Sequence, residues 1–127
     1  MKILYIEDNQ MDVDLTRKAL AKSTPDIEMD IVRTIQQAKN KFANAKEGVF
    51  DLILTDMHLP DGDGITFLEW VKEKKIPCAT VLITGHGDED IAVAALKSGV
   101  NDYLSKSTGY LEKLPGVLEN AMVRFQA

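Results

Sequence analysis

Asp51-Leu52-Ile53-Leu54-Thr55-Asp56-Met57-His58-Leu59-Pro60-Asp61-Gly62-Asp63-Gly64 is the stretch around which the rest of the chain can be organised. Its apolar run, Leu52 to Leu54, predicts a buried strand, because a parallel strand covered on both faces needs no polar alternation. The strand runs into Asp56, and the Pro, Asp and Gly residues that follow predict a turn. An acid at the carboxyl end of a central parallel strand lies where open α/β sheets bind their ligands. We therefore expect Asp56 to lie at the centre of a functional site.

On both sides of this stretch, strand patterns alternate with helical patterns along the whole chain. The expected strands are residues 2–6, 27–31, 51–56, 79–84 and 102–105. Each is followed by an expected helix, and the apolar residues assigned to the buried helix faces are Met11, Leu15 and Ala19; Ile35, Ala38 and Phe42; Ile65, Leu68 and Val71; Ile91, Ala95 and Leu96; and Leu114, Leu118, Met122 and Phe125. Pro115 is tolerable only in the first turn of the last helix. Short loops and right-handed crossovers predict one α/β domain over residues 1–127, a parallel sheet with helices on both faces.

Composition excludes several classes of protein. The 127 residues have a net charge of −5, which provides no electrostatic footprint for nucleic acid or an anionic membrane. The single Cys78 excludes a disulfide framework and fits a reducing cytoplasm, and it is expected to be a small core residue. The apolar run before Glu7 is too short for a signal peptide, and no stretch approaches the length of a membrane span.

Chemically versatile side chains follow four of the five expected strands. Glu7 and Asp8 follow the first, and Asp56, Thr84 and Lys106 come at the ends of three others. The carboxyl ends of parallel strands meet at one edge of the sheet, so these residues should converge. Any one of these acids alone would more often be a helix cap or a solvated loop charge. Their joint placement after separate strands indicates a site.

Three converging carboxylates require a counter-charge, which a hard divalent cation supplies. Mg²⁺ binds oxygen ligands at about 2.0–2.1 Å and keeps waters that phosphate oxygens can replace. Lys106 adds a mobile positive charge, and Thr84 adds a hydroxyl donor. The set suits attack by the carboxylate of Asp56 on a phosphoryl group, with the other groups holding the charge of its oxygens.

These residues resemble the receiver domain of two-component response regulators over nearly all of residues 1–125. The resemblance implies a flavodoxin-like, doubly wound, five-stranded sheet in the order 2-1-3-4-5 with five helices. It implies the following roles: Asp56 as phospho-acceptor; Thr84 and Tyr103 as switch residues; Thr84, the Gly85 N–H and Lys106 as phosphate-binding groups; and Asp8, Asp56 and the His58 backbone carbonyl as Mg²⁺ ligands, with Glu7 acting from behind them. Supporting context comes from the turn after Asp56 and from the run Gly99-Val100-Asn101-Asp102-Tyr103-Leu104.

The family resemblance also implies how the domain acts. It implies a signalling domain rather than an enzyme, one that promotes its own phosphorylation and dephosphorylation. A histidine kinase or phosphotransfer protein would phosphorylate it, and a downstream protein would bind the face made by the fourth helix, fifth strand and last helix. We expect no direct binding of nucleic acid or membrane, a cytoplasmic location, and a monomer or weak dimer.

Two features depart from the family pattern. Ser107 follows Lys106 where the family usually has proline, often after a cis bond, and a cis bond before a non-proline residue costs about 2.5–4 kcal/mol. We therefore expect a trans Lys106–Ser107 bond. Histidine occupies two positions that vary in the family, His58 and His86. They lack the local spacing of a zinc site, so we expect partly exposed side chains that shape the access of water.

Several other functions could use an acid at the end of a strand. A haloacid-dehalogenase-like phosphatase needs a second Asp where this chain has His58, and the acidic pair Glu7-Asp8 would repel the phosphate of a flavin nucleotide. A calcium loop starting at Asp61 fails because Lys72 falls where the closing Glu belongs. A receiver-like interaction module that is not phosphorylated is the most serious competitor. In lacking the Lys-Pro pair, the chain resembles receivers fused to sensory or kinase modules. This resemblance leaves open whether residues 1–127 are a whole protein or part of one.

Overall fold

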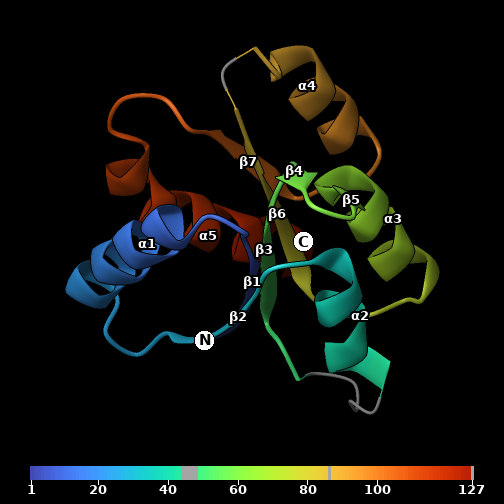
Figure 1. Cartoon of the computed structure of the whole chain (residues 1–127), viewed down its shortest axis with the longest axis horizontal. Helices are drawn as coiled ribbons and strands as arrows, with labels where there is room; N and C mark the ends of the chain where they lie inside the picture. Colours follow the sequence, from blue (N-terminus) through green and yellow to red (C-terminus); the bar gives the residue numbers. More distant parts are fainter. Residues whose placement is uncertain (44–48, 86, 127) are drawn as a thin grey trace.

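A five-stranded parallel sheet forms the centre of the protein in the computed structural model, which describes residues 1–43, 49–85 and 87–126. Its strands lie in the order β2-β1-β3-β6-β7, so the expected 2-1-3-4-5 arrangement is confirmed (Figure 1). The bounds are β1, Lys2–Ile6; β2, Glu28–Val32; β3, Leu52–Asp56; β6, Ala79–Thr84; and β7, Asp102–Ser105. Every residue of the central strands β3 and β6 is buried, as continuous apolar runs predict.

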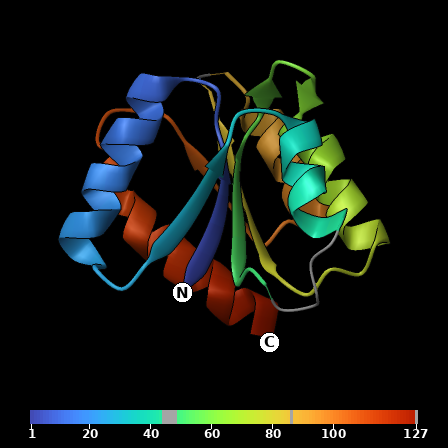
Figure 2. The same cartoon turned by 60° about the horizontal axis from the view of Figure 1, so that its bottom comes forward.

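Helices cover both faces of the sheet and bury two separate cores. The helices α1 (Gln10–Ser23) and α5 (Tyr110–Gln126) pack on one face, while α2 (Ile35–Ala43), α3 (Gly64–Glu73) and α4 (Glu89–Lys97) pack on the other (Figure 2). Odd-numbered residues of β1 point into the first core and even-numbered ones into the second, as strand alternation requires. None of the helices in the described ranges is long and apolar enough to cross a membrane.

The buried face of α1 differs from the one expected. Met11 and Leu15 are 72% and 43% exposed, and the buried residues are Val13, Thr16 and Leu20. Both sets of residues have helical spacing. The face with Met11 and Leu15 was predicted because it is apolar, whereas the face that is actually buried includes the polar Thr16. The Tyr5 hydroxyl lies 3.2 Å from Thr16 Oγ1, so a hydrogen bond removes the cost of burying that hydroxyl.

The ends of two other helices also differ from expectation. In α4 Ala92 is buried and Ile91 is exposed, and in α5 Ala121 is buried where Phe125 was expected. Pro115 lies in the second turn of α5, because the helix begins at Tyr110, earlier than the sequence indicated. Small alanines lie closest to the sheet, where larger side chains would hold the helices away.

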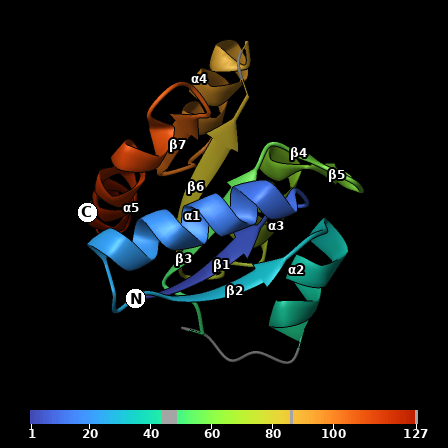
Figure 3. The ribbon, with the colours of Figure 1, turned by 60° about the vertical axis from the view of Figure 1, so that its left-hand side comes forward.

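The turn after Asp56 contains a short antiparallel pair that the sequence analysis did not predict. It consists of β4 (His58–Leu59) and β5 (Gly62–Asp63), beside the start of α3 (Figure 3). A two-residue strand is too short to show an alternating pattern. The pair fixes the path of the chain between β3 and α3.

Two acids of this turn cap helices. Asp61 accepts the N–H groups of Ile35 and Gln36 at 2.8 and 3.0 Å, and Asp63 accepts that of Thr66 at 2.8 Å. Burial opposes ionisation of Asp61, but the backbone hydrogen bonds outweigh it and lower the pKa of this carboxyl. The acids that resembled the start of a calcium loop therefore serve as caps at two helix N-termini.

Gly64 should be the least replaceable glycine near the site. A Cβ there would collide with the backbone carbonyl oxygen of Asp56 and lie 3.0 Å from a methyl group of Leu82. We expect Gly64→Ala to lower the free energy of unfolding by about 2–3 kcal/mol, because the strand must shift to relieve the overlap. Gly116→Ala is the control, since an added Cβ meets no atom within 4 Å, and it should raise stability by about 0.5–1 kcal/mol. Urea unfolding measures both, and equal stabilities would contradict the clash.

Candidate functional site

Four strand ends bring the candidate residues to one edge of the sheet. β1 and β3 pair Ile6 with Thr55, and β3 and β6 pair Asp56 with Ile83. β6 and β7 pair Thr84 with Ser105, and the backbone N–H of Lys106 then bonds the carbonyl of Thr84 at 2.8 Å. The register thus places the chain segments after all four strands beside one another.

The acids at this edge form a compact cluster. Glu7, Asp8 and Asp56 each offer a carboxylate oxygen, and these oxygens all lie within 4.8 Å of one another. Glu7 and Asp56 are buried, whereas Asp8 reaches solvent. Asp56 Oδ1 accepts the N–H of Met57 at 2.8 Å, which leaves its second oxygen directed to the cluster. Among the described residues this is the only group of three or more potential ligands with metal-site spacing.

Lys106 provides the counter-charge, and it has one more partner than the sequence indicated. Its Nζ lies 2.9 Å from Glu7 Oε1, 3.2 Å from Asp56 Oδ2 and 2.8 Å from Asp12 Oδ2. Asp12, from the first turn of α1, makes the shortest contact, and it was not among the predicted site residues. An acid in the first helical turn after the acidic pair was the available signal, but it equally suits an N-terminal cap. The three donors of the ammonium therefore all have carboxylate acceptors.

The pKa values of Glu7 and Lys106 are both raised above their ordinary values, for different reasons. Burial raises the pKa of Glu7, the hydrogen bond from Lys106 lowers it, and the charge of Asp56 raises it again, to about 7 overall. Burial alone would lower the pKa of Lys106, but the hydrogen bonds to Asp12 and Glu7 and the charge of Asp56 raise it above its ordinary value. Lys106 is therefore a permanent cation, whereas Glu7 exchanges a proton near neutral pH.

The remaining candidates lie on β6, on β7 and in the loop that follows β6. Thr84 is buried at the end of β6, and Gly85 follows it with a partly buried backbone. Tyr103 is half-buried in β7 and packs against the core formed with α2, α3 and α4. The Lys106–Ser107 bond is trans, as expected from the missing proline.

Of the two histidines, His58 lies among the described residues. His58 is mostly exposed, and its Nε2 lies 3.2 Å from Asp88 Oδ2 in the loop before α4. His86 lies outside the described residues. Cys78 is buried in the core, as expected, and burial raises the pKa of its thiol to about 12.

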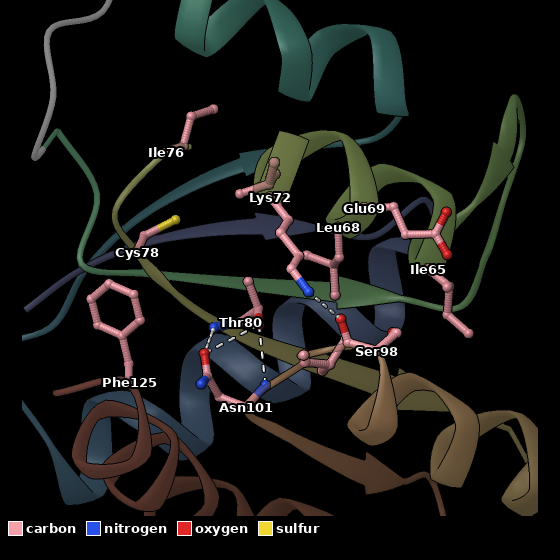
Figure 4. Close-up of a pocket in the computed structure, with 13 residues that line it drawn as sticks. Ile65, Leu68, Glu69, Lys72, Ile76, Cys78, Thr80, Ser98, Asn101 and Phe125 are labelled. Carbon is pink, nitrogen blue, oxygen red and sulfur yellow. Dashed lines mark hydrogen bonds between the residues drawn. The ribbon is translucent and has the colours of Figure 1, made fainter. Parts of the chain in front are cut away.

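A hollow of about 170 Å³ lies elsewhere, among α3, the end of α4 and α5 (Figure 4). Cys78, which precedes β6, lines it, so it lies toward the opposite end of that strand from Thr84. Lys72 crosses it to donate to the carbonyl of Ser98 at 2.9 Å, and Asn101 Oδ1 accepts the N–H of Thr80 at 2.9 Å. None of the clustered acids lines this hollow, so we assign the chemistry to the acidic edge.

A doubly wound sheet with clustered acids and a lysine at its carboxyl edge has the architecture of a signalling receiver. Comparison with protein families agrees, because residues 3–115 match the response regulator receiver domain. The chain belongs to this family, the receiver domains of two-component response regulators. The phosphatase and the flavin-binding alternatives are not favoured.

Individual relatives support this assignment. Response regulator Rcp1 of Synechocystis sp. is 35% identical over 115 residues, which cover 83% of this chain and 76% of that protein. Response regulator protein PilR of Pseudomonas aeruginosa is 31% identical over 105 residues. The chain spans only 22% of PilR, 28% of the methanogenesis regulatory protein FilR1 of Methanothrix harundinacea and 54% of the photosynthetic regulatory protein RegA of Cereibacter sphaeroides.

Solved structures show the same fold. A response regulator receiver domain protein from Clostridium thermocellum superposes with a TM-score of 0.84 at 27% identity, covering 98% of this chain and 96% of that one. The phosphorylated cyanobacterial phytochrome response regulator RcpA superposes with a TM-score of 0.75 at 30% identity, covering 99% and 94%.

Proposed function

We propose that residues 1–127 form a single receiver domain in which Asp56 accepts a phosphoryl group and thereby changes a protein-binding surface. One observation carries the assignment: Asp56 lies beside two further acids and within hydrogen-bonding distance of a fully paired lysine. The Met57 N–H holds one oxygen of Asp56, so the other is the nucleophile. A carboxylate needs no general base for this attack.

The phosphoryl donor is a phosphohistidine of a histidine kinase or phosphotransfer protein. A carboxylate oxygen of Asp56 forms a bond to phosphorus, and the phosphorus–nitrogen bond breaks. The imidazole leaves with the electron pair and is protonated. Lys106 gives up its longest bond, that to Asp56, and binds a phosphoryl oxygen, while Thr84 and the Gly85 N–H bind the others. The same groups favour the later attack of water, so the domain promotes both its own phosphorylation and its own dephosphorylation.

The acidic cluster fits Mg²⁺. Its donors are all oxygens and two of the carboxylates are buried, which suits a hard cation that keeps several waters. Asp8, Asp56 and the His58 carbonyl would hold the ion, with Glu7 behind them. When bound, the ion neutralises charge on the acids and on the phosphoryl oxygens.

The signal leaves the site through Thr84 and Tyr103. The added charge on Asp56 attracts the Thr84 hydroxyl, and Tyr103 moves inward to fill the space that this movement leaves. Tyr103 is half-buried in β7 between α4 and α5, so its movement alters the face made by these three elements. Ile91 and Val93 of α4 and Val123 of α5 are already exposed and suit a downstream protein partner. In the resting state we expect a monomer or weak dimer.

The test is labelling of the purified chain by a small phosphodonor such as acetyl phosphate. We expect labelling with Mg²⁺ and none with a chelator, and borohydride trapping of the acyl phosphate should locate it at Asp56. A receiver-like module that is never phosphorylated would remain unlabelled. Labelling at another residue would equally overturn the assignment.

The affinity for Mg²⁺ should depend on pH through Glu7. Because the pKa of Glu7 is raised to about 7, the metal-free native protein binds a proton that the unfolded chain has already lost. This contribution to stability is complete below the unfolded pKa of Glu7 and is lost as pH rises through about 7. A cation displaces that proton, so Mg²⁺ affinity should rise up to about tenfold from about pH 6 to about pH 8. Calorimetry measures this rise, which Glu7→Gln should flatten; a flat profile in the unaltered chain would contradict the role of Glu7.

A further inference from the structure

The carboxylate of Asp88 makes two contacts at the edge of the acidic site. Its Oδ2 accepts the backbone N–H of Gly85 at 3.2 Å and lies 3.2 Å from Nε2 of His58. The Asp88 side chain is only 17% exposed, so water screens its charge incompletely. The contact to His58 joins the loop after β6 to the segment after β3. The proposed acceptor, Asp56, is the last residue of β3.

Asp88 occupies the N-cap position of α4 but does not cap it with its side chain. An aspartate at this position ordinarily accepts an N–H from the first turn of its own helix. Here the side chain makes no such bond and turns back to Gly85 instead. The structure thus shows a helix without its usual cap and an acid bound to the Gly85 N–H, the donor that the proposed function assigns to the phosphoryl group.

The Gly85 amide has one N–H, and two acceptors compete for it. The proposed phosphoryl group on Asp56 requires this donor, which the carboxylate of Asp88 now holds. Both acceptors are anionic, so they also repel each other within the same small, partly desolvated space. Binding of a phosphoryl group at Gly85 therefore requires displacement of Asp88.

We propose that Asp88 is an internal competitor of the phosphoryl group, held on the Gly85 N–H by His58 in the resting state and released on phosphorylation. This role rests on the proposed function of Asp56. On release, the Asp88 carboxylate becomes free to accept the N–H of Asp90 or Ile91 and to cap α4. One movement of the Asp88 side chain then both frees the Gly85 N–H and caps α4. This movement connects phosphorylation to the face that α4 contributes.

The experiment measures binding of beryllium fluoride, a phosphoryl mimic that binds an aspartate carboxylate, in the presence of Mg²⁺. The variants are Asp88→Asn, which keeps an acceptor but loses the charge, and Asp88→Ala, which loses both. Glu89→Gln is the matched control, because it removes one charge from the same helical turn without touching Gly85. We expect Asp88→Ala to bind the mimic about tenfold more tightly than the unaltered chain, Asp88→Asn to fall between them, and Glu89→Gln to differ less than about twofold.

The amide resonance of Gly85 supplies a readout that is independent of affinity. In the unaltered chain it should report a hydrogen bond before addition of the mimic, and in Asp88→Ala this bond should be missing until the mimic is added. Equal affinities in Asp88→Ala, Asp88→Asn and Glu89→Gln, together with a Gly85 amide resonance that Asp88→Ala leaves unchanged, would overturn the competition while leaving Asp56 as the acceptor. No binding of the mimic by the unaltered chain would overturn the proposed function together with it.

Discussion

Asp56→Asn is expected to abolish labelling by acetyl phosphate while leaving the protein folded. The amide keeps an oxygen that can accept the Met57 N–H, so the local backbone is preserved. The second oxygen, which would attack phosphorus, becomes an NH₂ group with no nucleophilic lone pair. The same change removes one of the clustered charges and should weaken Mg²⁺ binding at least about tenfold. Mass spectrometry after exposure to the phosphodonor measures the first effect, and calorimetry measures the second.

Asp51→Asn is the matched control for this experiment. Asp51 precedes the same strand at its opposite end, where its Oδ2 accepts the Lys2 N–H at 2.8 Å. Labelling of Asp51→Asn should equal that of the unaltered chain. Persistent labelling of Asp56→Asn would remove Asp56 from the acceptor role, whatever the behaviour of the control.

Lys106→Met should destabilise the metal-free protein by about 2–3 kcal/mol at pH 7.5. Methionine preserves the length of the side chain but leaves Glu7, Asp12 and Asp56 without a cation within hydrogen-bonding distance. Removing one partner of a largely buried ionic group costs about 3–5 kcal/mol, and the 21% exposure of the lysine side chain reduces this value. Added Mg²⁺ should restore part of the loss, because it supplies positive charge to the same acids. Labelling should fall sharply in the variant, since no ammonium remains to bind the phosphoryl group.

The pH dependence gives this substitution a second signature. The raised pKa of Lys106 means that its stabilising contribution is complete below its unfolded value and is lost only as pH rises through the higher folded value. The acids that it pairs with are protonated at low pH. The difference between Lys106→Met and the unaltered chain should therefore be largest near neutral and mildly alkaline pH and should shrink in acid. Urea unfolding measures it, with the exposed Lys113→Met as control; equal stability of both variants near neutral pH would disprove the ionic role.

Much of the fold follows from patterns that lie within short stretches. The runs at 52–54 and 81–83 are uniformly apolar, as is typical of strands covered on both faces, and both strands were predicted closely. Alternation of strands with helices then restricts the topology, because crossovers between parallel strands are right-handed. Since parallel strands end at one edge, the meeting of Glu7, Asp56 and Lys106 also followed from the sequence.

The predictions that were wrong or incomplete share one cause: two patterns were equally compatible with the local sequence. α1 carries two faces at helical spacing, and the buried one includes Thr16, whose hydroxyl is paired with that of Tyr5 on β1. Phe125 in the last turn of α5 is 41% exposed, whereas Ala121, one turn earlier, is buried. Asp12 was not predicted as a site residue, since its distance from Lys106 depends on how α1 leaves β1.

The sequence by itself determined which residues end the strands, and with them the acids, the hydroxyl and the lysine that meet at the edge of the sheet. Only the tertiary structure decided how their charges are shared. Asp12 joins Lys106 across 94 positions of chain, and Asp88 takes the Gly85 amide instead of capping its own helix. The physical reason is that strand patterns reflect burial, which is encoded locally. Hydrogen bonds between separate elements depend on distances that arise only after those elements have packed.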